Sequence, residues 1–171
     1  MKLFMAYVGE RVTGCHLELH DIRFAIGNSI EECYDQIRAT CWGIPEKLHL
    51  DCWGALEYAD GYNITLKAEK PATDKKLFFV HLGGYTEDTF TEHHKNLLLV
   101  GEDENNVKKR ALTHDDAKSW SMAHKDSQFD IDDVISVQDS LKEKGLYIHL
   151  EKTEDVKPFL FKCTYVPLGK K

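Results

Sequence analysis

Hydrophobic residues fall in short continuous runs in several parts of this chain, and such runs predict strands. The first run ends at Gly9, and a second run of the same length ends at Gly83. Each run is followed by a shorter apolar segment that ends at a glycine, Gly27 or Gly101, where we expect the chain to turn. The pattern therefore predicts two pairs of strands, at residues 3–8 and 22–26 and at residues 77–82 and 97–100.

A helix is predicted after each pair of strands. Asn28 or Ser29 can cap the first helix, and Ser29 with Glu32 fits a capping box. Apolar residues from Ile30 to Cys41 then recur at helical spacing. In the second helix Asp103 is the candidate cap. Both helices are expected to lay one apolar stripe against a sheet.

Further extended segments follow each helix. They are residues 48–58 and 62–66 after the first helix, residues 131–137 and 146–150 after the second, and a last strand at residues 159–166. Asp60-Gly61 is a turn signal. Pro158 and Pro167 flank the last strand, and proline cannot donate to a strand ladder, so we expect this strand at the edge of a sheet.

The chain contains an internal repeat. Residues 2–27 align with residues 76–101 at a shift of 74, without a gap over 26 pairs. Seven pairs are identical, where unrelated segments would match at roughly one or two positions. The identical pairs are Lys2/Lys76, Leu3/Leu77, Phe4/Phe78, Gly9/Gly83, Glu18/Glu92, His20/His94 and Gly27/Gly101. The sequence therefore predicts two related modules.

The expected fold is α+β, with two tandem ββαββ modules related by a pseudo-twofold axis, mostly antiparallel sheet and two main helices. We expect one compact globular unit with these parts: a first module at residues 1–66, a linker at 67–75, a second module at 76–151, and a C-terminal edge strand and tail at 152–171.

Composition narrows the class of protein. The 171 residues are 42% hydrophobic and 30% charged, with a net charge of -7, which is typical of a soluble globular chain and argues against nucleic-acid binding. No apolar run reaches membrane-spanning length. The five cysteines form no Cys-x-x-Cys pair and are odd in number, so we expect reduced thiols and a cytoplasmic protein.

Two polar motifs recur in the alignment. Glu18-x-His20 corresponds to Glu92-x-His94, and residues two apart on an extended segment point to the same side. The second motif, His-x-Asp, occurs at His49/Asp51 and again at His124/Asp126, 75 residues later. A competing register pairs Asp51 with Asp130 and loses the histidine. We prefer the first register.

Three interpretations of these residues remain open. Imidazole and carboxylate groups suit a divalent transition metal, and a twofold axis could gather Glu18, His20, Glu92 and His94 around one ion. A histidine–carboxylate pair could instead perform acid–base chemistry, with His49, Asp51, His124 and Asp126 as the catalytic candidates. The third interpretation is structural, with the carboxylates bonding loop N–H groups or orienting the histidines.

The order of motifs resembles a known family. Lys-Leu-Phe at residues 2–4, Glu18-x-His20-Asp21, His49-x-Asp51-x-Trp53, Asp60-Gly61-Tyr62 and Leu82-Gly83-Gly84-Tyr85 resemble bacterial proteins grouped as domain of unknown function 1543. The resemblance covers most of residues 1–150 and implies a short domain that occurs once or twice per chain. It departs in the second copy, where no tryptophan follows His124-x-Asp126. The family brings no established activity, so the resemblance implies no catalytic residue.

The sequence leads to two hypotheses. The first is a duplicated binding or interaction module without catalysis of its own, with a small molecule or a protein as partner. The second is a metal-dependent enzyme that acts on small molecules through the Glu-x-His and His-x-Asp pairs. A paired-module fold with His and Glu ligands is also found in the vicinal oxygen chelate enzymes, an analogy at the level of fold.

Overall fold

The computed structural model describes residues 1–40, 42–86, 88–115 and 129–169. The chain forms two compact units, Met1–Glu69 with Ser140–Lys171, and Lys70–Asp139. The fold is α+β, and the described strand pairs are antiparallel, as predicted. These units divide the chain by its contacts, whereas the predicted modules divide it by its repeat.

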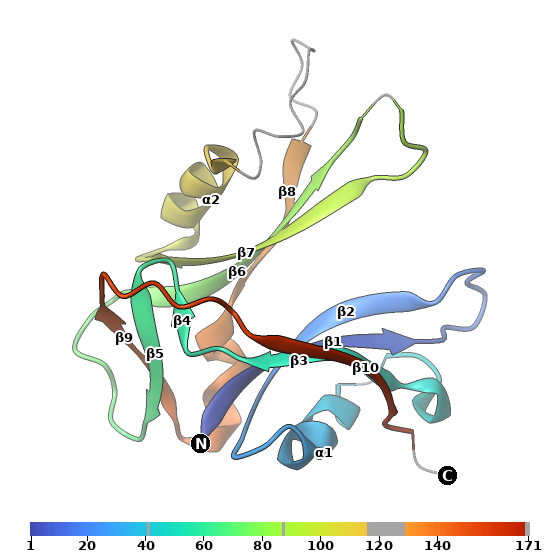
Figure 1. Cartoon of the computed structure of the whole chain (residues 1–171), viewed down its shortest axis with the longest axis horizontal. Coiled ribbons are helices and arrows are strands. Elements are labelled where there is room, and N and C mark those ends of the chain that lie inside the picture. The colour runs from blue at the N-terminus through green and yellow to red at the C-terminus, as the bar shows by residue number, and fades with distance from the viewer. Residues whose placement is uncertain (41, 87, 116–128, 170–171) are drawn as a thin grey trace. The chain divides into compact units, whose positions relative to one another are not determined.

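The main sheet of unit 1 has four strands in the order β10-β3-β1-β2 (Figure 1). Their bounds are β1 Lys2–Glu10, β2 Leu19–Gly27, β3 His49–Ala55 and β10 Phe161–Pro167. Strand β1 lies in the interior of the sheet and is buried at Ala6 and Val8, which are 0% exposed. The prediction of an edge position for the last strand is confirmed, because β10 is the outermost strand of this sheet as far as the described residues show, and it pairs with β3.

A second sheet in unit 1 joins distant parts of the chain. It contains β4 Tyr58–Ala59, β5 Tyr62–Lys67 and β9 Tyr147–Lys152, in that order. The turn between β4 and β5 is the predicted Asp60-Gly61, with φ of 49° and 82°. Glycine takes positive φ without strain, which suits a two-residue hairpin turn of this kind. Strand β9 pairs with β5 from Tyr62 opposite Lys152 to Lys67 opposite Tyr147.

The first predicted helix is shorter than its apolar stripe suggests. It consists of a 3-10 turn η1 Glu31–Cys33 and an α-helix α1 Tyr34–Arg38, and a further 3-10 turn η2 Pro45–Lys47 precedes β3. Glu32 accepts the backbone N–H of Asn28 at 2.8 Å, so Asn28, and not Ser29, is its partner. Gln36 bonds both the N–H and the carbonyl of Ile26, which ties the helix to the end of β2. Cys41 lies outside the described residues.

Unit 2 contains a three-stranded sheet in the order β7-β6-β8 and one helix. The bounds are β6 Lys76–Gly84, β7 His93–Gly101, α2 Glu104–Leu112 and β8 Phe129–Ser136. The 3-10 segment η3 Val137–Lys144 follows β8, and the division between the units falls within it, after Asp139. The predicted cap of α2 is confirmed, because the Asp103 carboxylate accepts the N–H of Asn106 at 2.8 Å. Val107 and Ala111 bury the apolar face of the helix against the sheet.

Each unit has its own hydrophobic cluster. The cluster of unit 1 joins β1, β3 and α1 and includes the C-terminal Leu168, which is 2% exposed. The cluster of unit 2 joins β6, β7 and α2.

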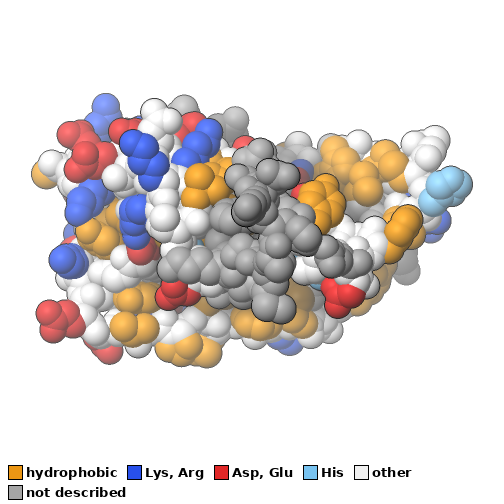
Figure 2. Space-filling view, turned by 90° about the horizontal axis from the view of Figure 1, so that it is seen from above, with side chains coloured by type: hydrophobic (Ala, Val, Ile, Leu, Met, Phe, Trp, Pro, Cys, Tyr) orange, Lys and Arg blue, Asp and Glu red, His pale blue; other side chains and the backbone are white. Residues whose placement is uncertain are grey.

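On the face drawn in Figure 2, basic and acidic side chains lie interspersed among hydrophobic ones. None of the helices in the described ranges is long and apolar enough to cross a lipid bilayer.

Candidate functional site

The candidate site lies over Gly9, near the end of the inner strand β1 in the main sheet of unit 1. Gly9 on β1 is opposite His20 on β2 and opposite His49 on β3. Cross-strand neighbours in one row project to the same face of a sheet. A Cβ atom added at Gly9 would lie 2.4 Å from His49 Nε2 and 3.0 Å from His20 Nε2. Glycine therefore leaves the space in which the two imidazoles approach each other.

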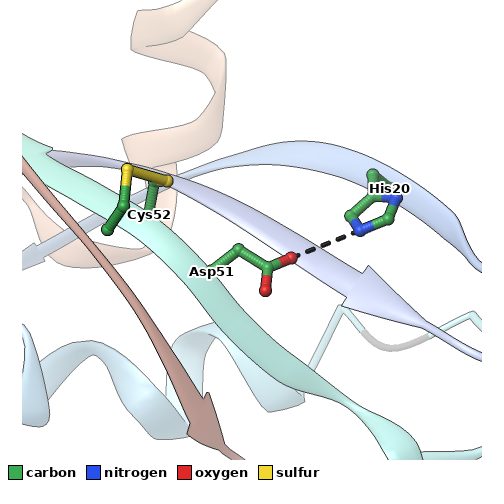
Figure 3. The surroundings of a disulfide bond; sticks show 4 residues. His20, Asp51 and Cys52 are labelled. Atoms are coloured by element: carbon green, nitrogen blue, oxygen red, sulfur yellow. Dashed lines mark ion pairs between the residues drawn. A yellow bond between two sulfur atoms is a disulfide. The ribbon is translucent and has the colours of Figure 1, made fainter.

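Two carboxylates complete the cluster. Glu18 precedes β2, and its Oε2 lies 3.8 Å from His20 Nε2 and 3.5 Å from His49 Nε2. Asp51 lies on β3, and its Oδ2 lies 3.3 Å from His20 Nε2 and 3.6 Å from His49 Nε2. Figure 3 shows the Asp51 side chain directed toward His20. Each carboxylate is thus close to both imidazoles.

A β-bulge places Asp51. Tyr7 on β1 pairs with Cys52 and the next residue, Val8, pairs with Leu50, so Asp51 is an extra residue in β3. The pairing of β10 with β3 also shifts here, between Cys163 and Val166. Bulges disrupt the ladder locally and re-aim side chains. The bulge explains how Asp51 reaches the cluster that His49 occupies.

The polar atoms that meet here are mainly hydrogen-bond acceptors. His49 is 2% exposed, and its Nδ1 lies 2.9 Å from the carbonyl oxygen of Lys47. Because a carbonyl only accepts, Nδ1 carries the hydrogen, and the Nε2 lone pair of neutral His49 faces the carboxylates. Asp51 Oδ2 is buried and has no hydrogen-bond partner within the described residues. A cation at the centre, or a proton added to an imidazole, would satisfy these atoms.

Two tyrosines flank the histidines. The Tyr7 ring stacks on His20 with 5.1 Å between centroids, and the exposed Tyr165 of β10 packs against His49 at 4.5 Å. Burial raises the pKa of the Tyr7 phenol, and the negative charge of Asp51 raises it further. Tyr7 is therefore a neutral O–H group at neutral pH.

The site is closed on one side and open on the other. The side chain of His49 is 3% exposed, whereas those of His20 and Glu18 are 33% and 39% exposed. Ligand atoms of Glu18, His20 and His49 all lie within 4.8 Å of one another, a spacing at which they could hold one metal ion. An ion there would be bound from the sheet side and accessible from the other.

The residues that align with Glu18 and His20 in the sequence repeat lie in unit 2. His94 Nε2 is 3.5 Å from Glu92 Oε2, and the His94 ring stacks on His81 with 4.7 Å between centroids. Gly83 on β6 is opposite His94 on β7, as Gly9 is opposite His20. The proposed sharing of one ion by Glu18, His20, Glu92 and His94 stays a prediction.

The preferred register of the sequence repeat aligns His49 and Asp51 with His124 and Asp126. Strand pairing supports a different alignment. Gly83 is opposite Asp130 on β8, whereas Gly9 is opposite His49. Asp130 thus takes the backbone position that corresponds to His49. The competing register paired Asp130 with Asp51, which is two residues away from this position. His124 and Asp126 lie outside the described residues.

Sequence reasoning separated residues that the structure brings together. It assigned Glu18 and His20 to metal binding and His49 and Asp51 to acid–base chemistry, whereas all four form one cluster. It also missed the role of Gly9. The identity of Gly9 and Gly83 in the repeat was the available signal, because a glycine inside a strand indicates close approach.

The expectation of reduced cysteines is wrong for one pair. Cys52 and Cys163 form a disulfide between β3 and β10, at a sequence separation of 111. The sequence could not predict this pair, because only the antiparallel pairing of β3 with β10 makes the two residues neighbours. Cys15 and Cys33 are not part of a disulfide; Cys15 is exposed and Cys33 is buried.

Comparison with known proteins connects this site to a family. Residues 15–66 match the Domain of Unknown Function DUF1543, and this stretch contains all four residues of the cluster. No curated protein matches the sequence. Among solved structures, the crystal structure of a protein Il1583 from Idiomarina loihiensis is similar, with 31% identity and a TM-score of 0.72. The match covers 99% of each chain.

Proposed function

Because residues 15–66 belong to the DUF1543 family, whose description names no activity, we propose a function from the geometry of the cluster. The proposed function is binding of one divalent first-row transition-metal ion in unit 1 by His20, His49 and Glu18, with Asp51 as a further ligand. The chain is then a metal-binding module, the more specific form of the binding module that the sequence predicts.

The N···O separations in the cluster carry this proposal. They are 3.3, 3.5, 3.6 and 3.8 Å, mostly longer than an ordinary hydrogen bond. With bonds of about 2.0–2.1 Å, two ligands of a tetrahedral ion lie roughly 3.3–3.5 Å apart. These four imidazole–carboxylate separations are close to those of ligands around one ion, and the ligand atoms of Glu18, His20 and His49 all lie within 4.8 Å of one another. The atoms that meet here mostly accept hydrogen bonds.

The ligand set favours certain ions. Imidazole and carboxylate together suit Zn²⁺, Fe²⁺, Mn²⁺, Co²⁺ and Ni²⁺, whereas Ca²⁺ and Mg²⁺ prefer oxygen ligands alone. The Nδ1 hydrogen bond from His49 to the Lys47 carbonyl supports this choice. Metal-bound histidines usually donate their other ring N–H in this way, which fixes the orientation of the ring.

Metal titration of the purified chain tests the proposal. After treatment with chelator, the protein is titrated calorimetrically with Zn²⁺, Mn²⁺ and Ni²⁺, and we expect one equivalent of at least one ion per chain. His49→Ala should abolish binding, and His20→Ala should weaken it strongly. His94→Ala is the matched control and should bind as the wild type does, because His94 belongs to unit 2. Absence of binding to all three ions would overturn the proposal.

The same titration distinguishes the shared site that the sequence suggested. If His94→Ala removes binding as completely as His20→Ala does, the ion is held by residues of both units. That result would replace the four-residue cluster of unit 1 with the set Glu18, His20, Glu92 and His94.

Metal-dependent catalysis on a small molecule is the second candidate function. The exposure of His20 and Glu18 favours it, because one side of a bound ion would remain accessible to water or substrate. Tyr7, neutral and stacked on His20, offers an O–H donor beside that opening. Relaxation of water protons by bound Mn²⁺ tests this candidate. Rapidly exchanging water on the ion would support it, and a fully shielded ion would exclude it.

The finer description of the fold is also a proposal, namely two ββαββ modules related by a pseudo-twofold axis. Strand registers support it, since Lys2 pairs with Gly27 and Lys76 pairs with Gly101, at the predicted shift of 74. The bulges support it as well, at Tyr7/Val8 and at His81/Leu82. A relative with a single module should form a homodimer, which light scattering can detect.

A further inference from the structure

We propose that the Cys52–Cys163 disulfide controls the metal affinity of the unit 1 site, and that a dithiol reductant weakens metal binding by thiol–disulfide exchange. This inference rests on the proposed metal binding and adds its regulation. Cys52 follows Asp51 directly in β3, and the disulfide joins it to the edge strand β10 (Figure 3).

The disulfide borders the irregular segment that carries Asp51. Cys163 pairs with Cys52, and the next pair toward the C-terminus is Val166 with Leu50. Between these pairs β10 has two residues, Thr164 and Tyr165, where β3 has Asp51 alone. Regular pairing is interrupted in this interval on both sides of Asp51. The covalent link at Cys52 therefore restrains a residue that the ladder holds weakly.

The same segment of β10 also contacts His49, the buried ligand of the site. The Tyr165 ring packs against His49 with 4.5 Å between centroids, two residues after Cys163. Cleavage of the disulfide therefore loosens two groups together: Cys52, the neighbour of Asp51, and the Tyr165 ring beside His49. Groups that orient metal ligands change affinity by about 10–100-fold when they are lost.

Strand β10 remains attached after reduction. Leu168 is buried, and its N–H donates to the carbonyl of Leu48 at 2.9 Å, while Arg38 bonds the Leu168 carbonyl at 3.2 Å. At the other end, Gly54 lies so close to Phe159 that an added Cβ would approach its ring to 2.6 Å. Reduction thus loosens the middle of the strand while both ends stay in place.

The disulfide is accessible to a reductant. Cys163 is exposed, as are its neighbours Lys162 and Thr164, because β10 is an edge strand. A thiolate of the dithiol attacks the Cys163 sulfur, and Cys52 leaves as a thiolate that takes up a proton. The second thiol of the reductant then attacks the mixed disulfide and releases Cys163. Two electrons and two protons pass to the cysteines, and the reductant becomes a disulfide.

Metal binding and disulfide formation must affect each other equally, because the two equilibria are thermodynamically linked. If the oxidised chain binds metal more tightly, metal must stabilise the disulfide by the same factor. A tenfold difference in affinity corresponds to about 30 mV in the reduction potential of a two-electron couple. The two quantities can be measured separately.

Zinc competition against a chromophoric chelator tests the inference in the full chain. The oxidised wild type is compared with Cys52→Ser/Cys163→Ser, and with wild type that has been reduced by a phosphine and separated from it by gel filtration. We expect zinc binding at least about tenfold weaker without the disulfide. Cys15→Ser is the matched control and should bind zinc as the oxidised wild type does, because Cys15 is an exposed free thiol. Circular dichroism checks that each variant is folded.

A redox titration supplies the second readout, without any substitution. The fraction of disulfide is followed by alkylation in a glutathione buffer, with and without free zinc held constant by a metal buffer. We expect zinc to make the midpoint more negative. Equal zinc affinities together with an unmoved midpoint would overturn the redox control and leave the metal site standing. If the oxidised wild type does not bind zinc, zinc binding by the unit 1 site is wrong, and the redox control of zinc affinity is overturned with it.

Discussion

The imidazole rings of His20 and His49 stand edge to face above Gly9, with 6.4 Å between their centroids. The two histidines come from strands on either side of β1 and are 29 residues apart in the sequence. Because Gly9 has no side chain, the space between the two histidines is free. Both Nε2 atoms and the carboxylates of Glu18 and Asp51 therefore meet over strand β1. This relationship is the basis of the site and of its most direct test.

Substitution of Gly9 by alanine should close the site. The new Cβ would lie 2.4 Å from His49 Nε2, so the buried ring must move away from the carboxylates. We expect loss of metal binding in calorimetry and destabilisation by about 1–3 kcal/mol, as for overpacked interiors. Urea unfolding with excess chelator separates the packing contribution from the metal contribution. Unchanged metal affinity in Gly9→Ala would contradict the described geometry.

Asp51→Asn preserves the shape of a ligand and removes its charge. We expect metal affinity to fall by about 10–100-fold, while the melting temperature of the metal-free protein stays the same or rises. The reason for the rise is that the new amide can donate to a histidine where Asp51 Oδ2 has no donor. Asp21→Asn is the control, since Asp21 pairs with Arg23 and is not one of the four residues of the cluster. Equal losses in both variants would mean that only net charge matters.

The titration of Tyr7 should depend on Asp51. Burial is the larger cause of its raised pKa, and the Asp51 carboxylate is the second cause. A negative charge opposes formation of the phenolate, so removal of that charge in Asp51→Asn should lower the pKa of Tyr7 while leaving it above the ordinary value. The difference in phenolate absorbance between wild type and Tyr7→Phe isolates this residue. A pKa that rises in Asp51→Asn would contradict the assignment.

The N-cap of α2 should contribute to stability. Asp103 accepts the N–H of Asn106, and its loss in Asp103→Ala leaves this donor unpaired at the helix end. We expect destabilisation by about 0.5–2 kcal/mol in chemical unfolding. Glu102→Ala changes the preceding exposed residue and should have a much smaller effect. Metal binding should be unaffected in both, because α2 belongs to unit 2.

Several elements could be predicted because their signals are local. Apolar runs that end at a glycine predicted strands β1 and β6. Pro158 and Pro167 predicted the edge position of β10. The first helix was predicted too long. Its apolar stripe extends past Arg38, where α1 ends, because hydrophobic spacing reports burial and does not specify where the backbone hydrogen bonds stop.

The site itself was predicted only in pieces. Glu-x-His and His-x-Asp each place two side chains on one face of an extended segment, which residue spacing alone implies. Their union over Gly9 depends on β1 lying between β2 and β3, and the position of Asp51 depends on a bulge. Strand order and bulges arise from long-range pairing, which leaves no spacing pattern in the sequence.

The sequence by itself determined the main strands, the repeat at a shift of 74 residues, and the nearness of His20 and His49 to a carboxylate two residues away, because period, turn residues and short spacing are properties of neighbouring residues. Only the tertiary structure decided that His20 and His49 face one another and that Cys52 meets Cys163. Those contacts depend on which strands lie side by side, and that choice comes from burial of the whole apolar surface of the unit.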